Sequence, residues 1–168
     1  MSATTLVSVE EYLATHYEPD CDYVDGVVEE RNVGEKDHSK LQGALFAWLY
    51  ERRRQLGIFV VVEQRLQVSP RRYRVPDVCV VLGREPDEQV FTAAPFLCVE
   101  VLSPEDRALR MEARIADYFT MGVEYVWVID PQTRRGWIHS RTAPIREVAD
   151  GILRAGPIEL PMSELFEE

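Results

Sequence analysis

The feature that most constrains the fold is a pair of apolar runs, FLCVEVL at 96–102 and EYVWVID at 124–130. Runs that are apolar at successive positions are typical of strands buried on both faces of a sheet. The residues between them have helical spacing, with Ser103 as a predicted N-cap and Gly122 where a helix ends. A strand, a helix and a strand in this order predict a right-handed β-α-β crossover that joins two parallel strands.

The other elements are predicted from the same kinds of signal. A helix capped by Ser8 opens the chain, and Asp25-Gly26 is a favoured turn between the two arms of a hairpin. A long helix runs from His38 to Leu56, before strands at about 58–68 and 74–82, and RRGWIHS with IREVA forms a later antiparallel pair. The sequence therefore predicts one domain over residues 1–168, of the α/β or α+β class, with a mixed sheet covered by helices.

Composition limits the cellular setting. No apolar run approaches the roughly 18 residues of a membrane span, and the N-terminus lacks the regions of a signal peptide. The three cysteines form no C-x-x-C pair, and two of them lie in apolar runs. We therefore expect a cytoplasmic protein with no membrane partner and no structural zinc.

The net charge of −10 is unevenly distributed. Residues 1–30 hold eight acidic groups and no Lys or Arg, so the other 138 residues carry only −2. Phosphate contacts need basic groups. Two arginine clusters could follow a nucleic-acid backbone, or could be solvated faces of a helix and a loop: Arg52, Arg53 and Arg54, and Arg71, Arg72 and Arg74.

Two carboxylates stand in predicted buried strands. Glu100 lies in the middle of FLCVEVL, and Asp77 follows Pro76 at the start of another apolar run. A buried carboxylate costs several kcal/mol unless something compensates its charge. A pair on neighbouring strands is suited to a hard divalent cation, which one or two carboxylates and waters commonly bind. The alternative is that each acid caps a turn or meets an arginine.

These motifs resemble a known family. SVEEYLA, YVDG, VPDVCVV, VEVLSP, Y-x-x-x-G-V at 118–123 and VWVIDP at 126–131 follow one another in the order typical of the Uma family, over residues 8 to 131. This family of bacterial restriction-endonuclease-like domains belongs to the PD-(D/E)XK nuclease-like superfamily. The resemblance implies a central mixed sheet flanked by helices, and DNA as the substrate.

The resemblance also implies a Mg²⁺ (or Mn²⁺) site. The superfamily's acids fall on Asp77 and Glu100, and the backbone carbonyl that completes the set falls on Val101. Such an ion polarises the phosphate and lowers the pKa of an attacking water. Duplex cleavage needs two sites, so a homodimer would suit this activity.

One family position departs from the pattern. The superfamily's lysine, two residues after the Glu, is Leu102 here, and the position that replaces it in the Uma family is Arg114. Arginine can stabilise negative charge on phosphate but cannot act as a general base, because its pKa exceeds about 12. Arg114 is therefore interpreted either as a catalytic charge stabiliser or as the counter-ion of Glu100. No lysine follows Lys40.

Further polar residues are candidates for the same site. His38 and Glu35, with Gln42, lie near the start of the long helix, from which superfamily members often add a residue to the site. Glu29 and Glu30 end the hairpin. Glu63 and Gln64 are neighbours in a predicted strand, so one of the two should point toward the site.

Three functions are compatible with these residues. The first is a divalent-metal-dependent endonuclease that uses Asp77, Glu100, Arg114 and His38. The second is a catalytically weakened domain of the same fold that binds nucleic acid or a protein partner, which Leu102 and the acidic N-terminal region favour. The third is a structural or oligomerisation domain with no metal affinity.

Overall fold

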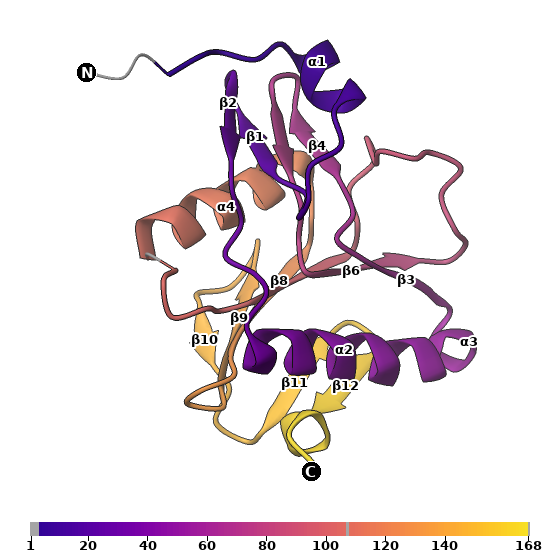
Figure 1. Ribbon diagram of the computed structural model, residues 1–168. Coiled ribbons are helices and arrows are strands. Elements are labelled where there is room, and N and C mark those ends of the chain that lie inside the picture. The colour runs from indigo at the N-terminus through magenta and orange to yellow at the C-terminus, as the bar shows by residue number, and fades with distance from the viewer. Residues whose placement is uncertain (1–3, 107, 168) are drawn as a thin grey trace.

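The computed structural model describes residues 4–106 and 108–167. Its elements form three sheets and the helices that cover them (Figure 1). The helices are α1 (Val9–Ala14), α2 (Lys36–Glu51), α3 (Arg53–Leu56), α4 (Ala108–Met121) and the 3-10 helix η1 (Met162–Leu165). The strands are β1 (Asp22–Val24), β2 (Val27–Glu29), β3 (Ile58–Val62), β4 (Leu66–Ser69), β5 (Arg72–Arg74), β6 (Val78–Leu82), β7 (Leu97–Val101), β8 (Tyr125–Asp130), β9 (Arg135–Ser140), β10 (Arg146–Glu147), β11 (Ile152–Ala155) and β12 (Ile158–Pro161).

The central sheet has six strands in the order β10-β9-β8-β7-β6-β3. β7 and β8 are parallel and α4 connects them, which confirms the predicted crossover, whereas the other neighbouring pairs are antiparallel. A second sheet, β2-β1-β5-β4, contains the predicted hairpin, whose turn residues Asp25 and Gly26 both have positive φ. The fold is thus α+β with a mixed central sheet, as predicted.

Helices cover both faces of the central sheet (Figure 1). On one face, Leu41, Leu45 and Leu49 of α2 are buried against β6, β7 and the β11-β12 hairpin. On the other face, Met111, Ile115 and Tyr118 of α4 pack with β4, β7 and β8. β7 therefore lies between two apolar layers, which explains why its sequence is apolar at almost every position.

Two predicted strands are each divided between the two larger sheets. The segment 58–68 is broken after β3, where Glu63 takes a φ of 50°, and β4 then joins the second sheet. The segment 74–82 is broken between β5 and β6, because Pro76 has no backbone N–H to donate to a sheet. The predicted strands were therefore too long, since β-branched composition does not show where a chain changes sheets.

Two further predictions need correction. α4 begins at Ala108 and not after Ser103, because residues 104–105 form a turn in which the Asp106 carboxylate accepts from Ser103. The β11-β12 hairpin was not predicted from the sequence. Among residues 4–106 and 108–167, no helix combines the length and apolar character needed to cross a membrane.

Candidate metal and nucleic-acid site

Asp77 lies between Pro76 and the first residue of β6, Val78, and is 2% exposed. Its Oδ2 accepts the backbone N–H of Val101 at 2.7 Å, and its Oδ1 accepts Arg31 Nη2 at 2.8 Å. Burial by itself would raise the pKa of Asp77, but the hydrogen bond to His38 and the charge of Arg31 outweigh it and lower that pKa. Asp77 is therefore an ionised carboxylate inside the protein.

Glu100 lies beside Asp77 on the neighbouring strand. β6 and β7 are antiparallel with Val78 opposite Val99, so Asp77, directly before Val78, and Glu100, directly after Val99, lie at the same end of the pair. Glu100 is 1% exposed, and burial raises its pKa to about 8, although Arg114 opposes the shift. The fold thus places two carboxylates together at one end of β6 and β7.

Arg114 of α4 is the nearest cation to Glu100. Its Nη2 lies 3.0 Å from Glu100 Oε1, an oxygen that also accepts the hydroxyl of Tyr118. The same guanidinium donates to the Val75 carbonyl at 3.1 Å, and its Nε lies 3.4 Å from Asp22 Oδ2. Burial lowers the pKa of Arg114, but the charges of Asp22 and Glu100 raise it well above its usual value, so Arg114 stays protonated.

Arg31 is a site residue that the sequence analysis missed. It follows β2 in an irregular segment, and its side chain is 2% exposed. Besides Asp77, its nearest acid is Glu63, whose Oε1 lies 3.9 Å from Nη1. Arg31 is separated from Asp77 by 46 positions, and no spacing pattern in the sequence indicated their contact.

Two α2 residues contact Asp77. His38 is buried with Nε2 3.3 Å from Asp77 Oδ1, and Gln42 Nε2 donates to the Asp77 carbonyl at 3.0 Å. Burial lowers the pKa of His38, but the hydrogen bond to Asp77 outweighs it and raises that pKa. The helix that was predicted to add a side chain to the site therefore brings two.

The other acidic and polar candidates lie farther from the carboxylate pair or are engaged elsewhere. Glu35 is exposed at the start of α2, and Gln64 donates to the carbonyl of Gln89 at 2.7 Å. Glu29 Oε2 contacts Arg74 Nη1 at 3.2 Å. Of this group Glu63 is nearest, since its backbone N–H donates to the Asp77 carbonyl at 3.3 Å.

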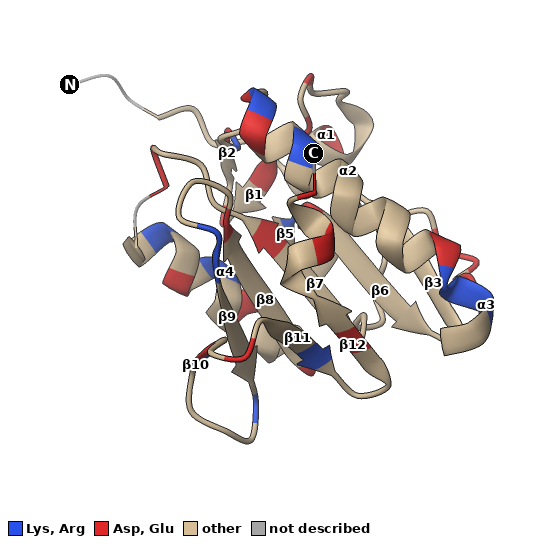
Figure 2. Cartoon of the chain, turned by 90° about the horizontal axis from the view of Figure 1, so that it is seen from below, with Lys and Arg blue, Asp and Glu red and all other residues tan. Residues whose placement is uncertain are grey.

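The two arginine clusters have different environments. Arg52 and Arg53 cover the rings of Trp48 and Tyr50 where α2 ends, about 20 Å along that helix from His38. Figures 1 and 2 show the neighbouring α3 on the opposite side of the molecule from α4. This cluster, which includes the exposed Arg54, therefore does not border the carboxylates.

The second cluster is divided between the surface and the interior. Arg71 is exposed, and Arg72 binds Asp25 at 2.8 Å and Asp117 at 3.0 Å. Arg74 is 3% exposed and contacts three carboxylates, so it is an internal counter-ion and not a surface contact for DNA. Its partners are Asp22 at 3.1 Å, Glu29 at 3.2 Å and Asp117 at 2.7 Å.

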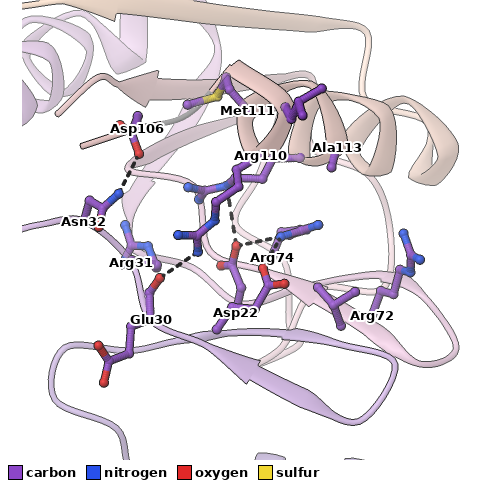
Figure 3. A pocket seen from close by; sticks show the side chains of 14 residues that line it. Asp22, Glu30, Arg31, Asn32, Arg72, Arg74, Asp106, Arg110, Met111 and Ala113 are labelled. Atoms are coloured by element: carbon purple, nitrogen blue, oxygen red, sulfur yellow. Dashed lines mark hydrogen bonds and ion pairs between the residues drawn. The ribbon is translucent and has the colours of Figure 1, made fainter. Parts of the chain in front are cut away.

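A pocket of about 260 Å³ opens beside these residues, between α4 and the β1-β2 hairpin (Figure 3). Its lining includes five arginines, Arg31, Arg72, Arg74, Arg110 and Arg114, and four acids, Asp22, Glu29, Glu30 and Asp106. Most of the acids are engaged: Asp106 accepts from Asn32 at 3.0 Å, for example. The pocket therefore borders the carboxylate pair through Arg31 and Arg114.

The donor chemistry of the pair fits a hard divalent cation. Within residues 4–106 and 108–167 no three His, Cys, Asp or Glu side chains gather as a metal cluster. Mg²⁺, however, is commonly held by one or two carboxylates with waters or phosphate oxygens. Tyr118 and Arg114 both contact Oε1 of Glu100, which leaves Oε2 free of those two partners. The Val101 carbonyl is the third candidate donor.

The fold and the paired acids define a nuclease-like α+β domain. A solved structure described as a "putative nuclease belonging to DUF820" from Anabaena variabilis is similar to this chain with a TM-score of 0.81 and 20% identity. The similarity covers 95% of this chain and 97% of that one. At this identity the likeness establishes the fold.

The sequence identifies the family. The profile of the Uma2 family, described as "Putative restriction endonuclease", matches residues 9–158. The chain therefore belongs to the Uma2 family, in agreement with the resemblance that its motifs showed. No curated protein matched the chain.

Proposed function

We propose that the chain is a divalent-metal-dependent endonuclease that hydrolyses phosphodiester bonds in DNA. The observation that carries this proposal is the burial of Asp77 and Glu100 side by side, with the pKa of Glu100 raised to about 8. A protein that buries two adjacent carboxylates accepts a large desolvation cost. A divalent cation would offset that cost, and the family assignment supports a nuclease.

In this proposal Asp77, Glu100 and the carbonyl of Val101 hold Mg²⁺ or Mn²⁺. The bound ion would polarise the phosphate and lower the pKa of the attacking water. Gln42 fixes the Asp77 backbone through its carbonyl, and Tyr118 holds the Glu100 carboxyl by donating its hydroxyl. The burial that raises the Tyr118 pKa well above its usual value keeps this hydroxyl protonated, so it remains a donor.

Arg114 and His38 have separate roles. Arg114 stays charged, so it stabilises negative charge on the phosphate and does not accept a proton. His38 is the only histidine in contact with the pair among the described residues, and its Nδ1 has no hydrogen-bond partner there. His38 is thus the candidate to orient or accept a proton from water. DNA would approach over Arg72 and Arg110, which line the pocket, and over the exposed Arg71 beside Gly26 of the hairpin turn.

The test combines metal titration with plasmid nicking. We expect the parent chain to bind Mg²⁺ or Mn²⁺ in calorimetry and to nick supercoiled plasmid, and Asp77→Ala and Glu100→Ala to lose both properties. Asp87→Ala is the matched control, because the Asp87 side chain is 94% exposed. A parent chain that binds neither ion would refute the metal site.

A second candidate function is a weakened nuclease-fold domain that binds nucleic acid or a protein partner. Arg114 in the family's lysine position and the Arg31 contact with Asp77 favour it. Under this alternative the parent binds metal and DNA without nicking, and Arg114→Lys gains cleavage. Light scattering of the chain with and without DNA would test the homodimer that duplex cleavage suggests.

A further inference from the structure

Arg31 lies between the carboxylate pair and the pocket. Its Nη2 is 2.8 Å from Asp77 Oδ1, and the same side chain lines the pocket with Arg110 (Figure 3). Arg114 lines the same pocket. The cation nearest to Asp77 therefore belongs to the protein itself. Arg31 occupies an oxygen of Asp77 that a divalent ion would also seek.

The remaining donors of Arg31 lack acceptors. Its Nε and Nη1 are buried without a hydrogen-bond partner among residues 4–106 and 108–167, and Nε of Arg114 is in the same condition. Each buried donor left unsatisfied costs about 1–3 kcal/mol. Arg31 Nη1 has only the distant Glu63 Oε1 at 3.9 Å, and Arg114 Nε has only the ion-pair contact with Asp22 Oδ2 at 3.4 Å, so both guanidinium groups could take a closer acceptor.

The acids of the pocket do not fill this need. Asp22 already accepts from Arg74 and from the Val75 backbone, Glu29 contacts Arg74, and Asp106 accepts from Asn32. A phosphate group offers several oxygens in the geometry that guanidinium groups bind best. A pocket of about 260 Å³ has room for it.

The same contact sets a condition for metal binding. A divalent ion on Asp77 is repelled by a guanidinium charge that shares the same carboxylate. Arg31 stands in the irregular segment between β2 and α2, so no sheet ladder holds its backbone in place. If Arg31 turns toward an anion in the pocket, Asp77 Oδ1 keeps only the longer contact with His38 Nε2 at 3.3 Å and becomes available to the ion.

We propose that the pocket is a phosphate subsite and that Arg31 exchanges Asp77 for the phosphate, so that phosphate and divalent cation bind cooperatively. The inference rests on the proposed metal site at Asp77 and Glu100. It assigns to Arg31 a positioning role, in which substrate arrival completes the metal site. Because coupling between two ligands is reciprocal, each should tighten the binding of the other by the same factor.

Calorimetry of the parent chain tests this directly. Mg²⁺ is titrated alone, with dimethyl phosphate, and with inorganic phosphate. We expect the Mg²⁺ dissociation constant to fall at least about five-fold when a phosphate is present. An effect of dimethyl phosphate supports a subsite for a strand diester, whereas an effect of inorganic phosphate alone supports one for a terminal or free phosphate. Equal Mg²⁺ affinity in all three titrations would overturn the proposal.

Arg31→Gln separates exchange from simple attraction between the two ligands. We expect this variant to bind Mg²⁺ at least about five-fold more tightly than the parent and to show no further gain with phosphate. Coupling that persists in the variant would come from direct attraction between ion and phosphate, and would refute the exchange. If the variant does not fold, equal Mg²⁺ affinity in the three parent titrations would still refute the proposal.

Arg84→Gln is the matched control. It also removes one positive charge, but the Arg84 side chain is 90% exposed and does not line the pocket. This variant should keep the coupling. Different results would refute the two proposals. If Asp77→Ala still binds Mg²⁺, the metal site is refuted. If Mg²⁺ binding needs Asp77 but its affinity does not change with phosphate, only the role of Arg31 is refuted.

Discussion

Glu100→Gln should stabilise the metal-free chain at neutral pH. Gln keeps the size of the side chain and an oxygen that can accept from Tyr118 and Arg114, while it removes the buried charge. The carboxyl of Glu100 has a pKa of about 8 in the folded chain, against an ordinary value of 4.5. The folded state therefore binds this proton more tightly than the unfolded state.

The sign and size of the effect follow from that difference. Stability linked to Glu100 is fully present below pH 4.5 and falls as the pH rises toward 8. Each pH unit inside the window is worth about 1.4 kcal/mol, so the parent should lose about 3 kcal/mol between about pH 5 and pH 7.5 relative to Glu100→Gln. The two chains should be about equally stable at the lower pH.

Urea denaturation of both chains in EDTA, followed by tryptophan fluorescence at several pH values, measures this difference. His38 also has a raised pKa and loses stability in the same direction. The hydrogen bond to Asp77 that mainly raises its pKa is kept in both chains, so most of its share cancels, and only the smaller effect of the Glu100 charge differs. A variant that is less stable than the parent at pH 7.5 would show that pairing with Arg114 outweighs the burial of the charge.

Adding Mg²⁺ in place of EDTA provides a second readout. If the ion binds the ionised carboxylates of the folded state only, it should raise the stability of the parent at pH 7.5 by RT ln(1 + [Mg²⁺]/Kd). Glu100→Gln should gain little. Equal stabilisation of the two chains would place the bound ion somewhere else.

Three other substitutions test the fold around the site. Asp22→Asn removes the charge that Arg74 and Arg114 share, and should cost about 3 kcal/mol of unfolding free energy in urea; an unchanged midpoint would show that those arginines find other partners. Leu45→Ala, at a fully buried position of α2, should cost about 2–5 kcal/mol and lower the thermal midpoint, unless the core closes the cavity. Gly156→Ala would place a Cβ 2.7 Å from Cζ of Phe96 at a φ of 52°, so calorimetry should show a loss of at least about 1 kcal/mol, and no loss would mean that the ring moves freely.

Much of the fold was predictable because its signals are local. The apolar run around Glu100, the helix that follows and the run at 124–130 predicted the parallel strand pair, and Asp25-Gly26 predicted the hairpin. The changes of sheet at Glu63 and Pro76 were not predicted. These changes depend on which strand each segment pairs with, and the local alternation of apolar and polar residues does not indicate the pairing partner.

The sequence by itself indicated that Asp77 and Glu100 are site residues on neighbouring strands, because a charged residue in or beside an apolar run can be recognised from the local pattern alone. Only the tertiary structure decided which cations meet them. Arg31 reaches Asp77 across 46 positions, and Asp22 meets Arg114 of a distant helix. Arginine side chains are long, and their contacts follow no fixed spacing in the sequence. The charge balance of the buried site is therefore established only when the hairpin, α2 and α4 pack around the ends of β6 and β7.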